Sequence, residues 1–308
     1  MSEKVQQWCL QIPVREGEEA RRKLIAEGKA DRSLKPYVQE GYLFIPVLEE
    51  TGMQAGFSPA RAHEELPRHE QIGGVVILQE DDPAEAEKIL AARPSTHTVL
   101  FATSPVEGEF RTKTFKVLAG KNTTETLYHE YGRRMIIDLT AAYFSARLSN
   151  ERQRILSSMK EGEKVLDMFA GVGPFPVMLS GKAKLVVAND INPSAVYFLQ
   201  KNIRLNRLQN VIPVLGDAMN LPRMLEPMKF DRIIMNLPFA AYGFLAGAAD
   251  LAAKGAVIHL YALVEKEGEH TEDILRAFPK AHITERFLRS YSPASWHAVY
   301  DIEVGDEM

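Results

Sequence analysis

The stretch that decides the fold is KVLDMFAGVGPF, residues 164–175. It begins with apolar residues typical of a buried strand and leads into a turn that contains Gly171 and Gly173. Glycines at these positions let the backbone approach a ligand closely, and Pro174 suits the first position of a helix. A dinucleotide-binding loop would have a third small residue where Pro176 stands, so the spacing argues against a dinucleotide.

Around this stretch, from about Ala141 onward, short strand-like runs alternate with helical stretches such as residues 192–206. This alternation is typical of a parallel sheet that helices cover on both faces. We expect the last run to be antiparallel, either at an edge or as an insert. The predicted fold class of residues 140–308 is therefore α/β, a seven-strand Rossmann-like domain. The seven runs are residues 164–169, 184–190, 211–217, 231–236, 256–263, 286–293 and 297–304.

Two small α+β domains are predicted before it, at residues 1–65 and 66–139. In the first, two strands flank a helix that stops at Gly28, and the polar residues 51–70 fit a linker. The second combines a helix that opens on Pro83 with strands that alternate polar and apolar residues. The expected elements are strands at 8–14, 41–47, 73–79, 98–103, 109–120 and 125–139, and helices at 17–28 and 83–92.

The composition, 45% hydrophobic and 25% charged over 308 residues, suits a soluble globular protein of two or three domains. No apolar run approaches the ~18 residues that span a bilayer, and the first residues lack the features of a signal peptide. We therefore expect a cytoplasmic protein with no membrane contact. Cys9 is the only cysteine, which excludes a disulfide within the chain and a zinc site of several thiolates. No metal site is predicted.

The charge is unevenly distributed along the chain. The formal net charge is -4, but residues 108–154 contain nine Lys or Arg against five Asp or Glu. A local basic zone attracts phosphates without making the whole surface bind nucleic acid. A solvated face would have the same composition, so charge alone leaves both interpretations open.

Acidic residues stand at the ends of two further predicted strands. Asp190 follows Asp167 by 23 positions, about the spacing at which an acid binds a ribose diol, and Asp217 is suited to accept from an exocyclic amine. One such acid would be read as a helix cap. Together with the glycine turn and Asn236 at a fourth strand end, they indicate a pocket for adenosine with a small tail. S-adenosylmethionine is the candidate that we favour.

Asn236 ends the run DRIIMN and is followed by Leu237 and Pro238. Its amide offers both a donor and an acceptor, so it is able to hold a base edge or the methionine amine. Pro238 restricts the backbone around Leu237 and thereby fixes where the amide points. Many methyltransferases that act on amino groups have Asn-Pro-Pro-Tyr here, whereas this chain has Asn-Leu-Pro-Phe and lacks the phenol.

Four motifs together resemble one family. They are YFSARLSNERQRI at 143–155, DMFAGVGPF at 167–175, DINP at 190–193 and NLP at 236–238. As a set they are similar to the archaeal and eukaryotic tRNA (guanine-37-N1)-methyltransferases, which are class I S-adenosylmethionine-dependent methyltransferases. The stretch EFRTKTFKVLAG and the N-terminal helix-strand unit resemble this family too, so the likeness covers nearly the whole chain.

The resemblance implies methyl transfer from S-adenosylmethionine to N1 of guanosine 37 in tRNA. We expect the protein to be a monomer. It assigns Glu151 as the carboxylate near guanine N1, Arg111 to the charge on O6 and Asn236 to the base. Without the resemblance, Glu151 would be interpreted as a surface ion-pair partner and Arg111 as an arginine on a solvated strand. Phe169 would be interpreted as a core residue. The implied cofactor-binding residues are Tyr143, Arg152, Asp167, Phe169, Gly171, Gly173, Asp190, Ile191, Asp217, Ala218, Asn236, Leu237 and Pro238. The implied substrate-binding residues are Ser145, Arg147, Arg133 and Arg134.

Two alternatives stay open, and a third is weaker. A wyosine-pathway enzyme at tRNA position 37 would methylate a tricyclic intermediate or transfer the aminocarboxypropyl group, although relatives of the latter kind generally lack the Asn of NLP. A non-catalytic RNA-binding protein would keep the same fold with a dead pocket. A cytosine-C5 methyltransferase needs a thiolate at its pocket, and Cys9 lies in the first predicted strand, far along the chain from it.

Overall fold

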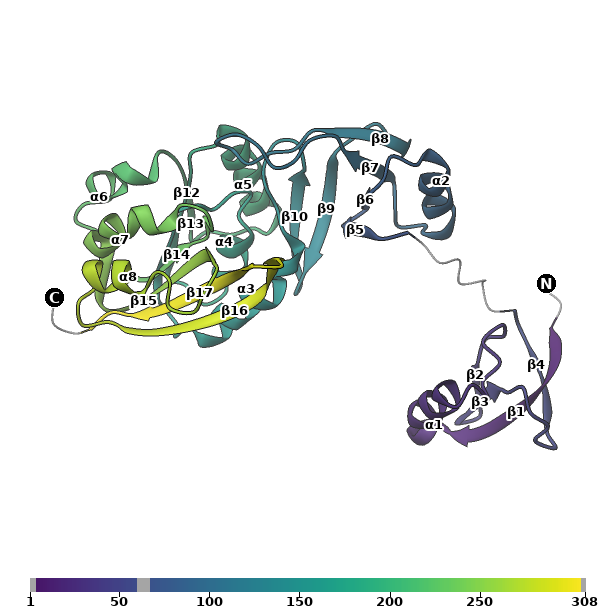
Figure 1. Ribbon diagram of the computed structural model, residues 1–308. Helices are drawn as coiled ribbons and strands as arrows, with labels where there is room; N and C mark the ends of the chain where they lie inside the picture. The colour runs from purple at the N-terminus through teal and green to yellow at the C-terminus, as the bar shows by residue number, and fades with distance from the viewer. Residues whose placement is uncertain (1–3, 60–66, 306–308) are drawn as a thin grey trace. The chain divides into compact units, whose positions relative to one another are not determined.

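A computed structural model (Figure 1) describes residues 4–59 and 67–305. The chain divides into two compact units, Met1–Leu66 and Pro67–Met308. The predicted domain boundary at residue 65 falls outside the described residues, and the division at residue 139 stays a prediction. Within the described ranges, no helix is long and apolar enough to cross a membrane.

The first unit is a four-stranded antiparallel sheet in the order β2-β3-β1-β4 with one helix. Its core includes Cys9, Leu34 and Phe57. The linker prediction was wrong for residues 54–57, because this short stretch pairs with β1 and becomes a strand that buries Phe57. The predicted helix begins three residues earlier than expected. The elements are β1 (Val5–Pro13), α1 (Val14–Ala26), β2 (Tyr37–Gln39), β3 (Tyr42–Pro46) and β4 (Gln54–Phe57).

The second unit opens with a four-stranded sheet in the order β5-β6-β7-β8. Helix α2 (Pro83–Ala92) begins where predicted, because the Asp82 side chain accepts from the backbone amides of its first turn. The strand predicted at 109–120 is correct only from Phe115 onward; the preceding residues form a loop in which Arg111 has a φ of 53°. The strands are β5 (His69–Ile72), β6 (Val75–Leu78), β7 (Thr98–Ala102) and β8 (Phe115–Gly120).

A two-stranded hairpin, β9 (Glu125–Glu130) and β10 (Arg133–Asp138), follows this sheet (Figure 1). Its turn is Tyr131–Gly132, and both residues have positive φ, as a tight hairpin turn requires. Met135 and Ile137 of β10 belong to one buried cluster with residues of β6, β7, α4 and α5. The hairpin therefore packs the small sheet against the helices of the larger domain.

The larger domain contains the predicted seven-strand sheet, in the order β13-β12-β11-β14-β15-β17-β16. Five strands are parallel, and β17 pairs antiparallel with both β15 and β16. The fold class is confirmed, and the last strand is an insert. The strands are β11 (Lys164–Asp167), β12 (Leu185–Asp190), β13 (Val211–Leu215), β14 (Phe230–Met235), β15 (Ala252–Val264), β16 (His282–Ser292) and β17 (Ser295–Glu303).

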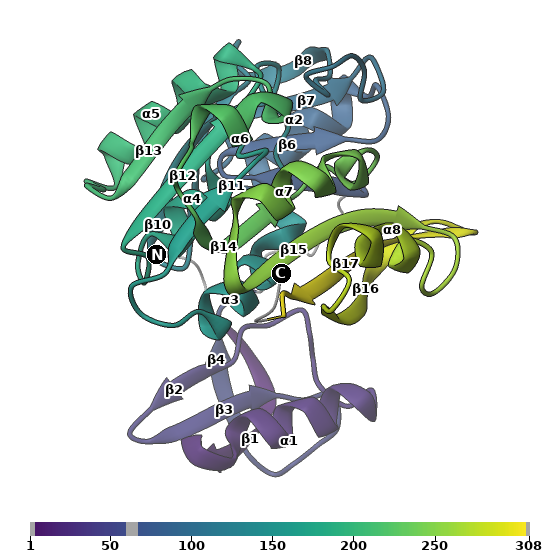
Figure 2. The same cartoon turned by 90° about the vertical axis from the view of Figure 1, so that its left-hand side faces the viewer.

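Helices cover both faces of this sheet (Figure 2). On each face, the helices and the sheet enclose a separate cluster of buried hydrophobic residues. One face carries α3 (Ser149–Ser158), α4 (Pro174–Leu179) and α5 (Pro193–Leu205). The other carries α6 (Leu221–Met224), α7 (Leu245–Leu251) and α8 (Thr271–Ala277). Short 3-10 turns η1 (Ala146–Leu148), η2 (Ala218–Asn220) and η3 (Ala241–Phe244) lie at the ends of these elements.

Gly173 explains why the turn after β11 needs glycine. Its φ is 91°, and an added Cβ would overlap with Cδ1 of the fully buried Leu199. Gly162 also has a positive φ, 86°, but no atom lies within 4 Å of the place that its Cβ would take. Both glycines thus avoid backbone strain, and only Gly173 avoids a steric clash as well.

We expect Gly162→Ala to lower the free energy of unfolding by about 1–2 kcal/mol, the cost of a left-handed alanine. Gly173→Ala should cost about 1–3 kcal/mol more, because the clash with Leu199 adds to the strain. Urea denaturation of both variants measures the difference. Equal losses would mean that the loop relaxes freely around a Cβ.

Candidate active site

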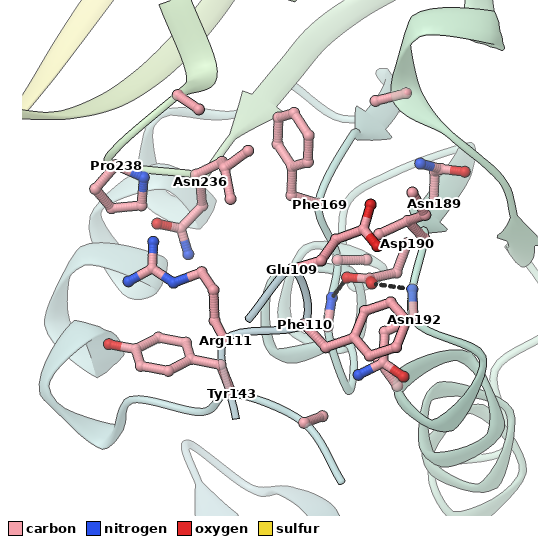
Figure 3. A pocket seen from close by; sticks show the side chains of 18 of the residues that line it. Glu109, Phe110, Arg111, Tyr143, Phe169, Asn189, Asp190, Asn192, Asn236 and Pro238 are labelled. Atoms are coloured by element: carbon pink, nitrogen blue, oxygen red, sulfur yellow. Dashed lines mark hydrogen bonds between the residues drawn. The ribbon is translucent and has the colours of Figure 1, made fainter. Parts of the chain in front are cut away.

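A cavity of about 390 Å³ opens at the carboxyl ends of β11, β12, β13 and β14 (Figure 3). This is the edge at which open α/β sheets bind ligands, and the volume suits a small-molecule site. Two segments before the sheet complete its wall, residues 109–111 of the β7–β8 loop and 142–148 before α3. Apolar side chains, among them Phe169, Ile191 and Phe244, line much of it.

Asp190 fixes the glycine turn to the neighbouring strand. Its carboxylate accepts from the backbone amides of Gly171 at 2.7 Å and Asn192 at 2.8 Å. Burial raises the pKa of Asp190. A carboxylate has about four acceptor positions, so Asp190 keeps acceptor capacity for hydroxyl groups of a ligand in the cavity.

Asp167 lies beneath the turn and does not line the cavity. One oxygen accepts from the Phe169 amide at 3.2 Å, and the other is buried with no hydrogen-bond partner in the described parts of the chain. Burial, and secondarily the charge of Asp190, raise the pKa of Asp167 to about 8. The carboxyl group is therefore mostly protonated at neutral pH.

Asn189 provides an observation that points to a ligand. Its Nδ2 donates to the Met168 carbonyl at 3.0 Å, while its Oδ1 is buried without a partner among the described residues. Asn189 lines the cavity. An unsatisfied buried acceptor at a cavity wall is expected to be paired by what binds there. The residues present thus fit a ligand with hydrogen-bond donors.

The third and fourth strand ends carry Asp217 and Asn236. Asp217 is exposed and caps η2 by accepting from the Met219 amide at 2.9 Å. Asn236 is half-buried at the cavity, and its side-chain amide makes no hydrogen bond within residues 4–59 and 67–305. The backbone after it is held, because the Pro238 carbonyl accepts from the Leu263 amide at 2.9 Å. The backbone next to Asn236 is thus fixed, and the Asn236 side-chain amide is available to a substrate.

Arg111 reaches this cavity from the β7–β8 loop (Figure 3). Its guanidinium lies 4.5 Å from the ring centroid of Phe239 and 5.2 Å from that of Tyr143, and it points toward Asn236. Burial lowers the pKa of Arg111. No acidic partner faces it among the residues that the structure describes. Two aromatic faces therefore hold a cation whose hydrogen-bonding capacity is unused.

Arg152 is buried at the base of the cavity, and all three of its guanidinium nitrogens already have acceptors. Nε donates to Glu130 at 2.7 Å, Nη2 donates to the other oxygen of Glu130, and Nη1 donates to the Ser145 carbonyl at 3.3 Å. Its predicted contact with the methionine carboxylate stays a prediction. In the structure, the Arg152 side chain joins α3 to the β9–β10 hairpin.

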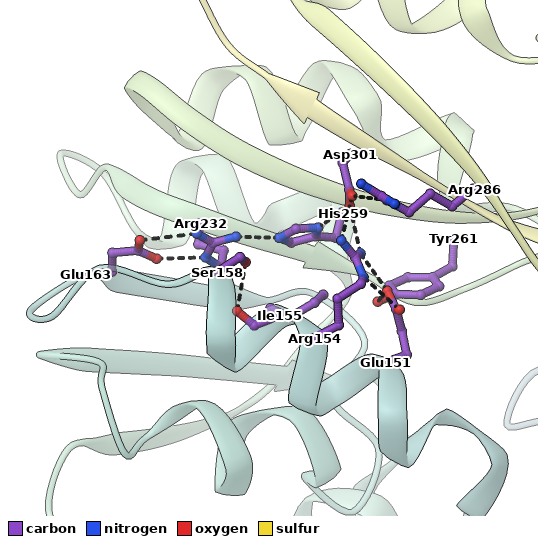
Figure 4. A network of polar contacts seen from close by, with 10 residues as sticks. All are labelled: Glu151, Arg154, Ile155, Ser158, Glu163, Arg232, His259, Tyr261, Arg286 and Asp301. Carbon is purple, nitrogen blue, oxygen red and sulfur yellow. Dashed lines mark hydrogen bonds and ion pairs between the residues drawn. The ribbon is translucent and has the colours of Figure 1, made fainter.

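Glu151 lies in a polar network next to the sheet and does not line the cavity (Figure 4). Its carboxylate accepts from the Tyr261 hydroxyl at 2.9 Å and twice from Arg154, at 2.7 and 2.8 Å. Arg154 also donates to Asp301 at 2.7 and 2.9 Å. The interpretation of Glu151 as an ion-pair partner therefore describes the structure, although Glu151 is buried and its partner Arg154 is only half-buried.

The structure brings most of the predicted site residues around one cavity and leaves six outside its wall. Around it lie Arg111, Tyr143, Ser145, Arg152, Phe169, Gly171, Asp190, Ile191, Asp217, Ala218, Asn236, Leu237 and Pro238. Outside it lie Asp167, Gly173, Glu151, Arg147, Arg133 and Arg134.

The basic residues outside the cavity differ in their contacts. Arg147 is 3.5 Å from Glu70, and Arg134 donates from its guanidinium to the Leu205 carbonyl at 3.2 Å. Arg133 lines a separate shallow cleft with Lys182. None of these contacts assigns a substrate to them.

Sequence reasoning missed Glu109, Phe110, Asn189 and Phe244, which all line the cavity. A signal existed for three of them. Glu109 and Phe110 directly precede Arg111, and Asn189 directly precedes Asp190. No sequence signal marks Phe244. It lines the cavity beside Phe169, and the two rings pack edge to face with their centroids 5.0 Å apart.

Five parallel strands, an antiparallel insert before the edge strand, a glycine turn and acids at successive strand ends define a class I methyltransferase fold. Comparison with known proteins agrees. The TRM5/TYW2 methyltransferase domain model matches residues 126–285, and the tRNA methyltransferase 5 N-terminal domain model matches residues 9–52. The chain belongs to the TRM5/TYW2 methyltransferase family.

Three similar proteins place the chain more closely. The tRNA (guanine(37)-N(1))-methyltransferase Trm5b of Pyrococcus abyssi is 36% identical, over 96% of this chain and 98% of that protein. The tRNA 4-demethylwyosine(37)-methyltransferase Taw21 of Saccharolobus solfataricus is 34% identical, over 77% and 93%. A solved complex of aTrm5 with tRNALeu has a TM-score of 0.72 and 30% identity, over 97% and 100%.

The raised pKa of Asp167 predicts a pH dependence of stability. The folded protein keeps this proton up to about pH 8, whereas the unfolded chain releases it near the ordinary value of 3.8. The contribution of Asp167 to stability is therefore full below pH 4 and is lost as pH rises toward 8. Asp167→Asn should remove that loss, so the variant should become more stable relative to wild type as pH rises from 5 to 9, in urea denaturation at each pH. Asp217→Asn is the control and should keep the wild-type pH dependence.

Proposed function

We propose that the protein transfers the methyl group of S-adenosylmethionine to N1 of guanosine 37 in tRNA. The observation that carries this proposal is the convergence of Arg111 and Asn236, 125 positions apart, at one side of an adenosine-sized cavity. Both present unused hydrogen-bonding groups there. The family and the full-length similarity to Trm5b support the same reaction.

The cofactor would occupy the cavity along the four strand ends. Asp190 would accept from the ribose hydroxyls, Asp217 from the adenine amine, and the apolar wall of Phe169, Ile191 and Ala218 would hold the adenine ring. The unpaired Oδ1 of Asn189 offers a further acceptor. When bound, S-adenosylmethionine supplies an electrophilic methyl group on a positively charged sulfur.

The chain's own residues would meet the demands of the base. Guanine N1 must lose a proton while negative charge develops on O6, so a cation at O6 lowers the barrier. Arg111 suits that position because its burial between Phe239 and Tyr143 strengthens its electrostatic effect. Asn236 would orient the base edge. We assign the general base to Glu151, a role that requires tRNA binding to bring this carboxylate and the base together.

The regions before the catalytic domain would recognise tRNA. We propose that residues 1–65 and 66–139 act as tRNA-recognition and RNA-binding domains of a monomeric enzyme. The nucleotide next to the anticodon lies in a stacked loop and must be extruded for methylation. Recognition of tRNA shape and phosphates then has to come from outside the cofactor pocket. Basic residues of the zone 108–154 that make no ion pair within the described residues, such as Lys113 and Arg133, are suited to it.

A wyosine-pathway activity is the second candidate, since Taw21 is almost as similar in sequence as Trm5b. Two observations favour guanine. The first is that residues 9–52 match the N-terminal domain model of tRNA methyltransferase 5. The match to Taw21 covers 93% of Taw21 but only 77% of this chain. Asn236 is also present, with its amide available at the cavity.

Incubation with unmodified tRNA and labelled S-adenosylmethionine, followed by nucleoside analysis, tests the proposal. We expect 1-methylguanosine from a transcript with guanosine 37 and none from one with adenosine 37. A product seen only with tRNA that carries 4-demethylwyosine would overturn the proposal in favour of the second candidate. Failure of S-adenosylmethionine to raise the melting temperature would point to a non-catalytic protein.

The chemical roles predict distinct defects in single-turnover rates. Arg111→Ala should slow methyl transfer by about 10²-fold, as for loss of a group that stabilises developing charge. Glu151→Gln should slow it by about 10²–10⁴-fold and alter its pH dependence. Both should bind S-adenosylmethionine normally by calorimetry. The exposed Arg276→Ala and Glu161→Gln are matched controls and should react at the wild-type rate; a wild-type rate in either test variant removes that residue from the chemistry.

A further inference from the structure

We propose that a second cavity beside the active site binds one phosphodiester of the tRNA backbone next to the target nucleotide. We call it the anion cavity. It has a volume of about 200 Å³, and its charged lining residues are Glu70, Arg111, Lys113, Arg147 and Arg289. The inference rests on the proposed function and adds a substrate site to it.

The anion cavity and the active-site cavity share a wall. Arg111, Tyr143 and Ser145 line both, as do Ala142 and Phe144. A group bound in the anion cavity would thus contact residues that also face the active site. The two sites are adjacent, as a nucleobase and the phosphates of its own chain are.

The anion cavity contains four cations and one acid. Only Arg147 has an acidic partner, Glu70, at 3.5 Å, and the side chain of Arg147 remains 58% exposed. For Arg111, Lys113 and Arg289 no ion pair exists among the residues that the structure describes. Half-buried cations without a counter-charge are costly, so the lining is expected to be completed by an anion.

Arg289 of β16 carries the strongest evidence for this anion. Its Nε is buried and has no acceptor in the described parts of the chain. Its Nη2 contacts only Nε2 of His297, at 3.3 Å. Burial, together with the charges of Arg289 and Arg111, lowers the pKa of His297 to about 4, so this partner is neutral and leaves the arginine charge uncompensated.

A phosphodiester fits these groups better than a carboxylate of the cofactor. Guanidinium and ammonium groups from three separate elements surround the cavity, and phosphate oxygens accept from several directions at once. The rest of its lining is largely apolar, with Ile72, Ile77 and Phe115 among others, and its volume leaves little room for a bulkier ligand. An extruded nucleotide whose base enters the active site carries its phosphates alongside. The adjacent anion cavity is where one of them would be held.

The test measures tRNA affinity against salt concentration for Lys113→Gln, Arg289→Gln and the double variant. Each single variant should bind tRNA about tenfold more weakly at low salt, the loss expected for a charged hydrogen bond. The double variant should reduce the slope of log affinity against log salt by about one, since one phosphate contact is lost. Arg289→Lys, which keeps the charge, should retain the wild-type slope.

Matched controls are Lys201→Gln and Arg276→Gln, which remove the same charges from ion pairs with Glu125 and Asp273 outside the anion cavity. They should keep the wild-type slope, and affinity for S-adenosylmethionine should be unchanged in every variant. An unaltered slope in the double variant would overturn the inference, as would a loss of cofactor affinity, which would assign the cavity to the methionine carboxylate. The wild-type protein, assayed in parallel, should form 1-methylguanosine. Its activity keeps a failure of this inference distinct from a failure of the proposed function.

Discussion

The buried ion pair between Arg152 and Glu130 is the interaction on which the active site depends. Both side chains are 1% exposed, and the contact is bidentate. Removing either partner would leave a buried charge uncompensated, which is strongly destabilising. The pair ties α3 to the hairpin, which in turn packs the β5–β8 sheet against α4 and α5. Arg111 comes from that smaller sheet, so its position at the strand ends of the larger one follows from this contact.

The strand ends form the other half of the site. Asp190 accepts hydrogen bonds from the backbone amides of Gly171 and Asn192, and the bond from Gly171 ties the end of β12 to the glycine turn. Parallel pairing brings the carboxyl ends of β11, β12, β13 and β14 to one edge, where their polar residues share a cavity. The buried carboxyl of Asp167 supports the turn from below and stays protonated at neutral pH. The cofactor side of the site is thus held by hydrogen bonds between strand ends, while its substrate side consists of aromatic and basic side chains.

The antiparallel insertion of β17 has its own consequence. It brings Asp301 next to His259 of β15 and Arg154 of α3. Burial opposes ionisation of Asp301, but hydrogen bonds from His259 and Arg154 hold its pKa well below the usual value. Nδ1 of His259 donates to Asp301, which leaves Nε2 to accept from Arg232. Through Arg154 this network holds Glu151, so the sheet topology positions a residue that the sequence motifs relate to the substrate.

The sequence by itself determined the α/β class, the seven strands, the helix that opens on Pro83 and the cavity residues at the strand ends. These features depend on local patterns: apolar runs, glycine and proline chemistry, and the shared edge of parallel strands. Tertiary structure decided what depends on partners distant in the chain. Gln54–Phe57 has no strand-like alternation and becomes a strand by pairing with β1, and Arg111 reaches the cavity from a loop in which its own φ is positive. The burial of Glu151, the engagement of Arg152 by Glu130 and the unpaired charge of Arg289 also have no local signature, because each depends on which side chains packing brings within a few ångströms.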